Sequence, residues 1–351
     1  MNLPSAYPTR TRPAGEGDYG NFKQPWKLVW RMLTSGNRAA ISALCREGFK
    51  KTVTPVDWAL SQFETDYDST EHTTSAQPIL LVVGAPRSGT TLVYQTLAHC
   101  CEVSYFSNLT ALFPRAPILA TRWFSHRFGV PATDFRSFYG QTTALSDPND
   151  GFVFWNRWLG DDRYSPTTEL PPATIDSMLN FLRAWTTTFR LPFLNKNNRN
   201  TSCIALLAKA IPEAQFVVVR RNAMYVAQSL IHARKNIQGD KRASWGLMSR
   251  SVRGDQDPLG YVDDICDQVL EIERDLQLQL NQVSASRIHS VAYESFCRDP
   301  VAMMEQIHDA IPDVRLRTDV IQKQPFPFKI SNAQSVDDDE LRRIQARLPF
   351  S

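Results

Sequence analysis

The 351-residue sequence predicts an α/β fold in which helices flank a parallel sheet, with a small helical segment in front of it. Three short apolar runs rich in β-branched residues predict strands at 79–83, 215–219 and 287–294. Helical patterns separate these runs, and strands that alternate with helices form parallel sheets. Ligands of such sheets bind beyond the carboxyl ends of the strands, so we expect functional residues in the loops that follow them.

Composition and charge restrict the class of protein. Hydrophobic residues make up 42% and charged residues 21%, which is typical of a globular chain and excludes a fibrous or disordered one. The formal net charge of +3 is too small to indicate a nucleic-acid partner. Six cysteines without a CxxC pair favour reduced thiols and a cytoplasmic location. The sequence shows no apolar run of membrane-spanning length and no hydrophobic signal core, so we expect a soluble protein.

The chain divides into three predicted parts. Residues 1–24 combine prolines and glycines without periodicity, which predicts a flexible arm. Residues 25–77 predict a helical lead-in, with Pro25 and Pro55 at positions where helices begin. The polar stretch 66–77 marks the predicted boundary, and residues 78–351 form the main domain. Trp26, Lys27, Trp30 and Arg31 suit either a docked helix or one on a membrane surface. Docking is the commoner outcome, so membrane contact is not expected.

The segment GAPRSGTT, Gly84 to Thr91, directly follows the first predicted strand. Gly84 and Gly89 allow the backbone to curl so that its N–H groups face one anion, and a helix beginning near Thr90 adds its positive end. The spacing is that of a phosphate-binding P-loop, but Thr90 stands where the nucleoside-triphosphate loop has lysine. The cation inside the loop is Arg87, whose planar fork suits oxyanions. The alternative is a tight glycine turn with an exposed arginine. Such a turn would not require Arg, Ser, Gly, Thr and Thr in this order.

PRSGTTL resembles the 5′-phosphosulfate loop of sulfotransferases that use 3′-phosphoadenosine 5′-phosphosulfate (PAPS). The bacterial and tyrosylprotein branches of that family typically have arginine in the loop, as here. The resemblance implies a P-loop-like α/β fold, PAPS as donor and no metal. It also implies that Arg87 acts in catalysis and that the loop binds the donor through Arg87, Ser88, Gly89, Thr90 and Thr91.

VVVRRNAMYVAQSL resembles the 3′-phosphate site of the same family, a strand that ends in arginine followed eight residues later by serine. The matching pair is Arg221 and Ser229, and Arg220 is one position early, so we expect it to point elsewhere. An arginine at a strand end and a serine two helical turns on can converge on one phosphate. The alternative is a surface arginine and an unrelated helix serine.

Two further segments extend the resemblance to residues 79–307. FLNKNNRN is similar to the segment in which a lysine precedes the 3′-phosphate strand, which implies that Lys196 holds the sulfuryl oxygens. YESFCRDPVAMMEQI is similar to the late strand-turn-helix of the family, which implies that Tyr293 approaches the nucleotide.

The residue at the position of the catalytic base differs from the family pattern. Asn108 stands where the tyrosylprotein branch has its catalytic glutamate, and an amide cannot take a proton from an acceptor hydroxyl. This argues against a tyrosylprotein sulfotransferase. Asp150 and Asp147, in LSDPNDGF, are the best base candidates, and a helix N-cap is the alternative for either. His126 is the next candidate.

The predicted reaction is sulfuryl transfer from PAPS to a hydroxyl of a small-molecule, carbohydrate or glycolipid acceptor. Two other functions stay open, a nucleotide kinase or NTPase-like enzyme and a non-catalytic 3′-phosphoadenosine-binding protein. A tryptophan-rich helical pattern follows the base candidates and suits either the core or an acceptor-binding wall. Its aromatic residues are Phe152, Phe154, Trp155 and Trp158.

Overall fold

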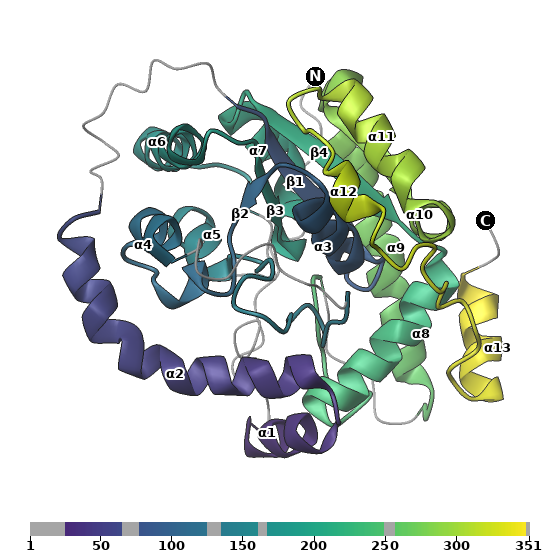
Figure 1. Ribbon diagram of the computed structural model, residues 1–351. Helices are drawn as coiled ribbons and strands as arrows, with labels where there is room; N and C mark the ends of the chain where they lie inside the picture. The colour runs from purple at the N-terminus through teal and green to yellow at the C-terminus, as the bar shows by residue number, and fades with distance from the viewer. Residues whose placement is uncertain (1–24, 65–76, 125–134, 161–166, 249–256, 349–351) are drawn as a thin grey trace.

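The computed structural model describes residues 25–64, 77–124, 135–160, 167–248 and 257–348, and it confirms the predicted fold class. Within these residues, parallel strands form a five-stranded sheet in the order β2-β3-β1-β4-β5, and helices cover both faces (Figure 1). The predicted arm 1–24 and most of the boundary segment lie outside the described residues. The strands are β1 Ile79–Val83, β2 Ser104–Tyr105, β3 Phe193–Lys196, β4 Ala214–Arg220 and β5 Ile288–Ala292.

The three predicted strands are confirmed as β1, β4 and β5, whereas β2 and β3 had no sequence signal. β2 has two residues, and β3 reads FLNK, so neither shows the apolar run that a buried strand normally presents. Asn195 of β3 is nevertheless fully buried, because its side chain accepts a hydrogen bond from Trp155 Nε1 at 2.7 Å and donates one to the Asn149 carbonyl at 3.1 Å. A strand with satisfied polar side chains can therefore lie inside the sheet.

Alternate residues of β1 enter two different hydrophobic clusters, as expected for a sheet buried on both faces. Leu81 and Val83 pack with residues of α5, α6 and α7, whereas Leu80 and Val82 pack with residues of α3, α10 and α11. The helices that follow the lead-in are α3 Thr90–Cys100, α4 Pro117–Phe124, α5 Phe152–Leu159, α6 Pro172–Phe189, α7 Ile204–Ala210, α8 Ala223–Ala233, α9 Gly260–Leu280, α10 Tyr293–Arg298, α11 Pro300–Ala310, α12 Thr318–Ile321 and α13 Asp338–Arg347.

The lead-in consists of α1 Pro25–Thr34 and α2 Arg38–Ser61. Pro25 begins α1 as predicted, but the expectation that Pro55 begins a helix is wrong, because Pro55 lies inside α2. An interior proline costs one backbone hydrogen bond. Pro55 and Lys51, whose carbonyl loses that bond, are both exposed, so water can hydrate the carbonyl. Buried packing on either side of Pro55, at Val53 and Leu60, keeps the helix continuous.

Both lead-in helices are attached to the rest of the protein by hydrogen bonds. Asp57 of α2 is 1% exposed, and its carboxylate accepts the backbone N–H groups of Arg115 at 3.0 Å and Ala116 at 3.2 Å. Arg31 of α1 donates to the carbonyls of Asn236 at 2.9 Å and Ile237 at 2.8 Å. No helix among the described residues is long and apolar enough to cross a membrane.

We expect Asp57→Ala to lower the free energy of unfolding by about 2–4 kcal/mol, because two buried backbone N–H groups would lose their acceptor. Urea denaturation would measure this change. The control is Asp313→Ala, since Asp313 is exposed and its removal should change stability by about 0.5 kcal/mol at most. Equal effects of the two substitutions would show that Asp57 does not hold α2 in place.

Candidate active site

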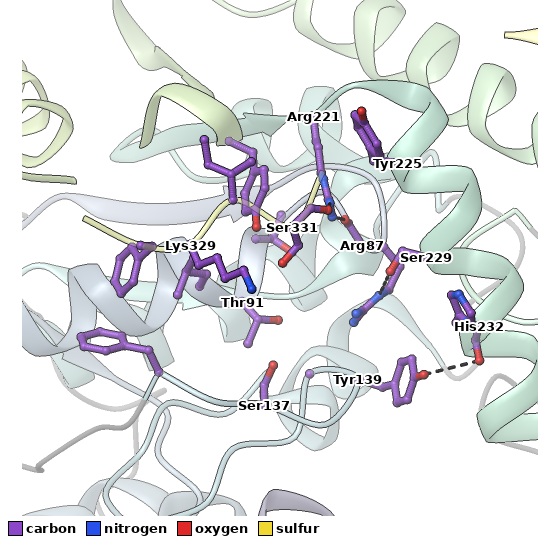
Figure 2. Close-up of a pocket in the computed structure, with 18 of the residues that line it drawn as sticks. Arg87, Thr91, Ser137, Tyr139, Arg221, Tyr225, Ser229, His232, Lys329 and Ser331 are labelled. Carbon is purple, nitrogen blue, oxygen red and sulfur yellow. Dashed lines mark hydrogen bonds between the residues drawn. The ribbon is translucent and has the colours of Figure 1, made fainter. Parts of the chain in front are cut away.

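A cavity of about 700 Å³ lies at the carboxyl ends of four parallel strands (Figure 2). The loop after β1 contributes Arg87 and residues 89–92, β3 ends in Lys196, Arg221 follows β4, and Tyr293 follows β5. Residues 135–140 and 325–335 contribute the remaining walls together with α8. The segments that follow these strands, where functional residues are expected, therefore line one cavity.

The wall of the cavity is positively charged. Arg87, Lys196, Arg221 and Lys329 all line it, and no aspartate or glutamate is among the described lining residues. Lys196 is paired with Asp150, and the charges of the other three repel one another in the absence of an anion. The cavity is therefore suited to a ligand with several negative charges.

The loop between β1 and α3 requires its glycines. A Cβ atom on Gly84 would lie 2.3 Å from the Val219 carbonyl oxygen, and one on Gly89 would lie 2.3 Å from Cδ2 of Tyr293. Both residues also have positive φ angles, 149° and 99°. The hydroxyl of Thr201 closes the base of the loop, since it accepts from Gly84 N–H and donates to the Gly84 carbonyl, both at 3.0 Å. The loop is thus fixed by strands and helices far away in the sequence.

Helix α3 begins at Thr90, as predicted, and its first N–H groups have no acceptor within the helix. Thr90 is 3% exposed, and Thr91 lines the cavity with Leu92. The Ser88 hydroxyl is buried without a protein partner. The position of the usual P-loop lysine is therefore occupied by a small buried residue. Hydrogen-bond donors remain at the loop for an anion.

Arg87 lies between Arg221 and Ser229 (Figure 2). Its Nε donates to Ser229 Oγ at 2.9 Å, and its guanidinium lies 4.8 Å from the centre of the Tyr139 ring. Burial lowers the pKa of Arg87 below its ordinary value, and the charge of Arg221 adds to this lowering. Both causes disfavour the charged guanidinium, and a bound anion would favour it.

Arg221 is held by neutral partners. It donates to the Arg87 carbonyl at 3.2 Å, to Oδ1 of Asn332 at 3.2 Å and to the carbonyl of Ser331. Its guanidinium lies 4.5 Å from the centre of the Tyr293 ring, and its Nε is buried without a protein partner. The structure therefore brings Arg221 and Tyr293 together with the loop, as the resemblance implies.

Arg220 turns away from the cavity. It donates to Oε1 of Gln277 at 2.8 Å and lies 4.0 Å from the carboxylate of Glu273, both on α9. The expectation that Arg221 rather than Arg220 belongs with Ser229 agrees with this geometry.

Lys196 and Asp150 form a buried ion pair. Nζ of Lys196, a residue 2% exposed, donates to Oδ2 of Asp150 at 2.9 Å. A Cβ atom on Gly140 would lie 3.6 Å from this carboxylate oxygen and 3.7 Å from the ammonium nitrogen. Lys196 and Gly140 line the cavity, whereas Asp150 is not among its lining residues and lies behind them, beside Gly140.

Asp147 has a different environment. Its Oδ2 accepts the N–H groups of Thr143 at 3.0 Å and Ala144 at 2.8 Å, which is the pattern of a carboxylate that stabilises a turn. Asn108 holds the same turn, because its amide donates to Thr142 Oγ1 at 2.8 Å and to the Ala144 carbonyl at 2.7 Å. Asp147 is not among the residues that line the cavity. His126 lies outside the described residues.

The tryptophan-rich helix α5 belongs to the core, which was one of its two interpretations. Phe154 and Trp155 are fully buried, and Trp158 is also buried in the cluster that packs against α6. Phe152 is half-buried. None of these four residues is among those that line the cavity, so an acceptor-binding wall at this helix is not supported.

Comparison with known proteins identifies the family. A model described as the sulfotransferase family matches residues 78–312, well over half of the chain. The chain belongs to the sulfotransferase family. The match includes the loop, Lys196, Arg221 and Tyr293, but it ends before Lys329.

The omega-hydroxy-beta-dihydromenaquinone-9 sulfotransferases Stf3 of Mycobacterium bovis and Mycobacterium tuberculosis are 21% identical to this sulfotransferase over 257 residues. The match covers 67% of this chain and 63% of theirs, so the chain spans less than two thirds of their length. Sulfotransferase STF1 of Mycobacterium tuberculosis superposes with a TM-score of 0.50 at 11% identity, over 95% of this chain and 93% of that one. STF9 of Mycobacterium avium superposes with a TM-score of 0.51 at 14% identity, over 78% and 76%. These two structures share its fold.

Several lining residues of the sulfotransferase cavity had no sequence signal. Tyr139 and Gly140 lie in a segment without a motif, and Lys329 lies beyond the part of the chain in which the resemblance was found. Other lining residues that the sequence analysis did not single out include Ser137, Tyr225, Gln228, His232, Trp245 and Ser331.

We expect Gly89→Ala in the sulfotransferase loop to lower the free energy of unfolding by about 2–4 kcal/mol. The reason is backbone strain at positive φ together with the overlap with Tyr293. Thermal unfolding would measure it. Gly48→Ala is the matched control, because Gly48 lies within α2 with open space around it and alanine there should stabilise by about 0.5–1 kcal/mol. A neutral Gly89→Ala would contradict the close approach of Tyr293.

Proposed function

We propose that this sulfotransferase transfers a sulfuryl group from PAPS to a hydroxyl group of its acceptor. The observation that carries the proposal is the cationic wall around a P-loop-like loop that lacks lysine. PAPS carries a 5′-phosphosulfate and a separate 3′-phosphate, so its site needs cations in more than one place. β3 and β4 pair with β1 on opposite sides, and Lys196 and Arg221 at their ends therefore flank the loop from both sides.

The 3′-phosphate is assigned to Arg221 and Ser229. Arg221 has a buried Nε without a protein partner, and Ser229 lines the same cavity. Lys329 and Ser331 bring a further cation and hydroxyl to the wall. A site of this kind distinguishes a 3′-phosphorylated nucleotide from ATP or AMP, since buried cations would otherwise stay without a counter-charge.

In the proposed reaction, the loop between β1 and α3 stabilises the charge that develops during transfer. In the transfer, the bond between sulfur and the bridging oxygen breaks as the bond between sulfur and the acceptor oxygen forms, and 3′,5′-bisphosphoadenosine leaves. The N–H groups of residues 89–91 and the positive end of α3 face the charge that grows on the leaving phosphate, and Arg87 adds its guanidinium. Lys196 binds the sulfuryl oxygens. No step assigns a role to a metal ion.

Asp150 is the proposed general base. Of the two carboxylates considered, it is the one hydrogen-bonded to Lys196, a lining residue, and its Oδ2 lies 3.6 Å from the Cβ position of Gly140, a second lining residue. Asp147 is assigned to the turn that it holds. The ammonium of Lys196 would then contact both the Asp150 carboxylate and the sulfuryl group. The acceptor oxygen would bind between that carboxylate and the sulfur atom.

The two other functions are less well supported. Thr90 is small and buried where a kinase or NTPase loop has its lysine, and the family match favours sulfate transfer. A non-catalytic 3′-phosphoadenosine-binding protein would have no need of a carboxylate paired with the lysine that lines the cavity.

The acceptor is proposed as a class. The Stf3 relatives are named for an omega-hydroxylated dihydromenaquinone, so a hydroxylated lipid-like molecule joins the carbohydrate and glycolipid acceptors expected from the sequence. We place the reaction in the cytoplasm, which agrees with the finding that all six cysteines are free and five of them buried.

We expect Arg221→Ala to weaken binding of 3′,5′-bisphosphoadenosine about tenfold to hundredfold and to remove its preference over AMP. Isothermal titration calorimetry with both nucleotides would measure this. Arg220→Ala is the matched control and should leave both affinities unchanged, because Arg220 faces α9. If the Arg221→Ala protein still prefers the bisphosphate, the 3′-phosphate site lies elsewhere.

We expect Asp150→Asn to lower the rate of transfer about a hundredfold to ten-thousandfold, because the acceptor hydroxyl would lose its base. The assay uses labelled PAPS and an acceptor found by screening hydroxylated lipids and sugars. Asp147→Asn should keep most of the activity and lower the free energy of unfolding by about 1 kcal/mol.

Both variants should bind 3′,5′-bisphosphoadenosine as the wild type does. Near-normal transfer by Asp150→Asn would exclude this residue as the base. A wild-type protein that binds the bisphosphate tightly yet sulfates no acceptor would instead support the non-catalytic function.

A further inference from the structure

Exposed apolar side chains are concentrated on the lead-in helices. Among the described residues, eleven large apolar side chains are classed as exposed, and eight of them lie between residues 26 and 63. The other three are Trp123, Leu270 and Leu278. The eight are Trp26, Trp30, Leu33, Ile41, Phe49, Val56, Trp58 and Phe63.

Helix α2 carries both buried and exposed apolar side chains. Val53 and Leu60 are buried against the main domain. Phe49 and Val56 are 56% and 47% exposed, and each precedes one of these buried residues by four positions, so they border the buried face of α2. The exposed part of a helix docked on a globular protein is normally polar, so these side chains add unusual apolar surface to the lead-in.

Helix α1 shows the same arrangement. Leu28 and Met32 are buried, whereas Trp26 and Trp30 are 85% and 68% exposed. Because the tryptophans are four residues apart, they lie side by side on the outer face. Tryptophan is enriched where proteins meet the interfacial region of a bilayer.

The charge of the two helices complements an anionic surface. Residues 25–61 contain six basic and two acidic residues, so their formal net charge is 6 − 2 = +4, compared with +3 for the whole chain. The remainder of the chain is thus at −1, and the excess positive charge belongs to these helices. The acidic residues are Glu47 and the buried Asp57, and the basic residues are Lys27, Arg31, Arg38, Arg46, Lys50 and Lys51.

We propose that a docking face, made of the exposed apolar side chains of α1 and α2, attaches this protein to the surface of an anionic lipid bilayer. Exposed tryptophan and phenylalanine would enter the interfacial region. Arg31 and Arg46 bind the main domain, so the basic residues that would face lipid phosphates are Lys27, Arg38, Lys50 and Lys51. A second copy of the chain is the less suitable occupant, because a two-fold symmetric contact through this face would bring the same +4 segments together.

Helix α1 adjoins the cavity through its buried face, which lies opposite the exposed tryptophans. Leu28, Met32 and Ile237 form a cluster against which Tyr139 and Trp245 pack, and the latter two line the cavity. Asn236, which accepts a hydrogen bond from Arg31, donates to the Tyr139 hydroxyl at 2.6 Å. In Figure 1, α1 and α2 lie along the lower edge of the molecule, beside the end of α8. A hydroxylated lipid in the bilayer would then lie close to the site, and this last step rests on the proposed function.

The test is co-sedimentation of the full 351-residue chain with vesicles. Vesicles of phosphatidylcholine with about 30% phosphatidylglycerol should bind the wild type about tenfold more strongly than phosphatidylcholine alone. The triple variant Trp26→Ser, Trp30→Ser, Phe49→Ser should lose about tenfold or more of this binding. These side chains are largely exposed, so their replacement should leave folding intact.

The matched control is Leu270→Ser with Leu278→Ser, which removes two exposed leucines from α9 and should not change vesicle binding. A wild type that stays in the supernatant with both kinds of vesicle would overturn the proposal. So would a wild-type dimer in light scattering that the triple variant converts to a monomer, because a second copy would then cover the face.

The docking proposal and the proposed function can be disproved independently of each other. The triple variant should bind 3′,5′-bisphosphoadenosine with wild-type affinity, since none of its three residues lines the cavity. If the wild type binds anionic vesicles but not the nucleotide, the proposed function is wrong and the docking proposal is still supported.

Discussion

The site depends on holding like charges together around an open cavity. Burial raises the free energy of the charged form of Arg87, and the nearby charge of Arg221 adds to this cost. Their hydrogen bonds and ring contacts in the structure involve neutral groups, among them Ser229, Asn332 and the rings of two tyrosines. Such partners fix the direction of a guanidinium without cancelling its charge. The arginines are therefore oriented in advance, with their charge still available to an anion.

That arrangement relies on the sheet, because the loop makes contact with residues that are remote in the sequence. Gly84 lies against the Val219 carbonyl, Gly89 lies against Tyr293, and Thr201 closes the base of the loop. β1 lies between β3 and β4, so the loop after β1 meets the ends of both neighbouring strands. A local glycine turn would form from its own residues. This loop takes its shape only when the sheet is complete, which couples the anion site to the folded state.

The sequence predicted the parts of the fold that rest on local pattern. The apolar runs of β1, β4 and β5 and the periodicity of α9 are visible along the chain, but β3 is not, because its polar residues are satisfied only by tertiary partners such as Trp155. The same limit applies to the site. Lys196 and Asp150 were both candidates, yet their pairing across 46 residues of sequence requires β3 to be in place. Tyr139 and Lys329 reach the cavity through loop geometry, for which no residue pattern exists.

The lead-in helices show why one sequence pattern supported two interpretations. Docking on the protein and contact with a membrane were treated as alternatives for α1, yet its buried and exposed apolar residues occupy different faces, so one helix can do both. Tyr139 joins the two regions, because it contacts Arg87 through its ring and accepts a hydrogen bond from Asn236, to which α1 is attached. The outer surface of the helices and the anion site are thus connected by direct contacts. A partner that holds α1 in place therefore also stabilises the wall on which Arg87 rests.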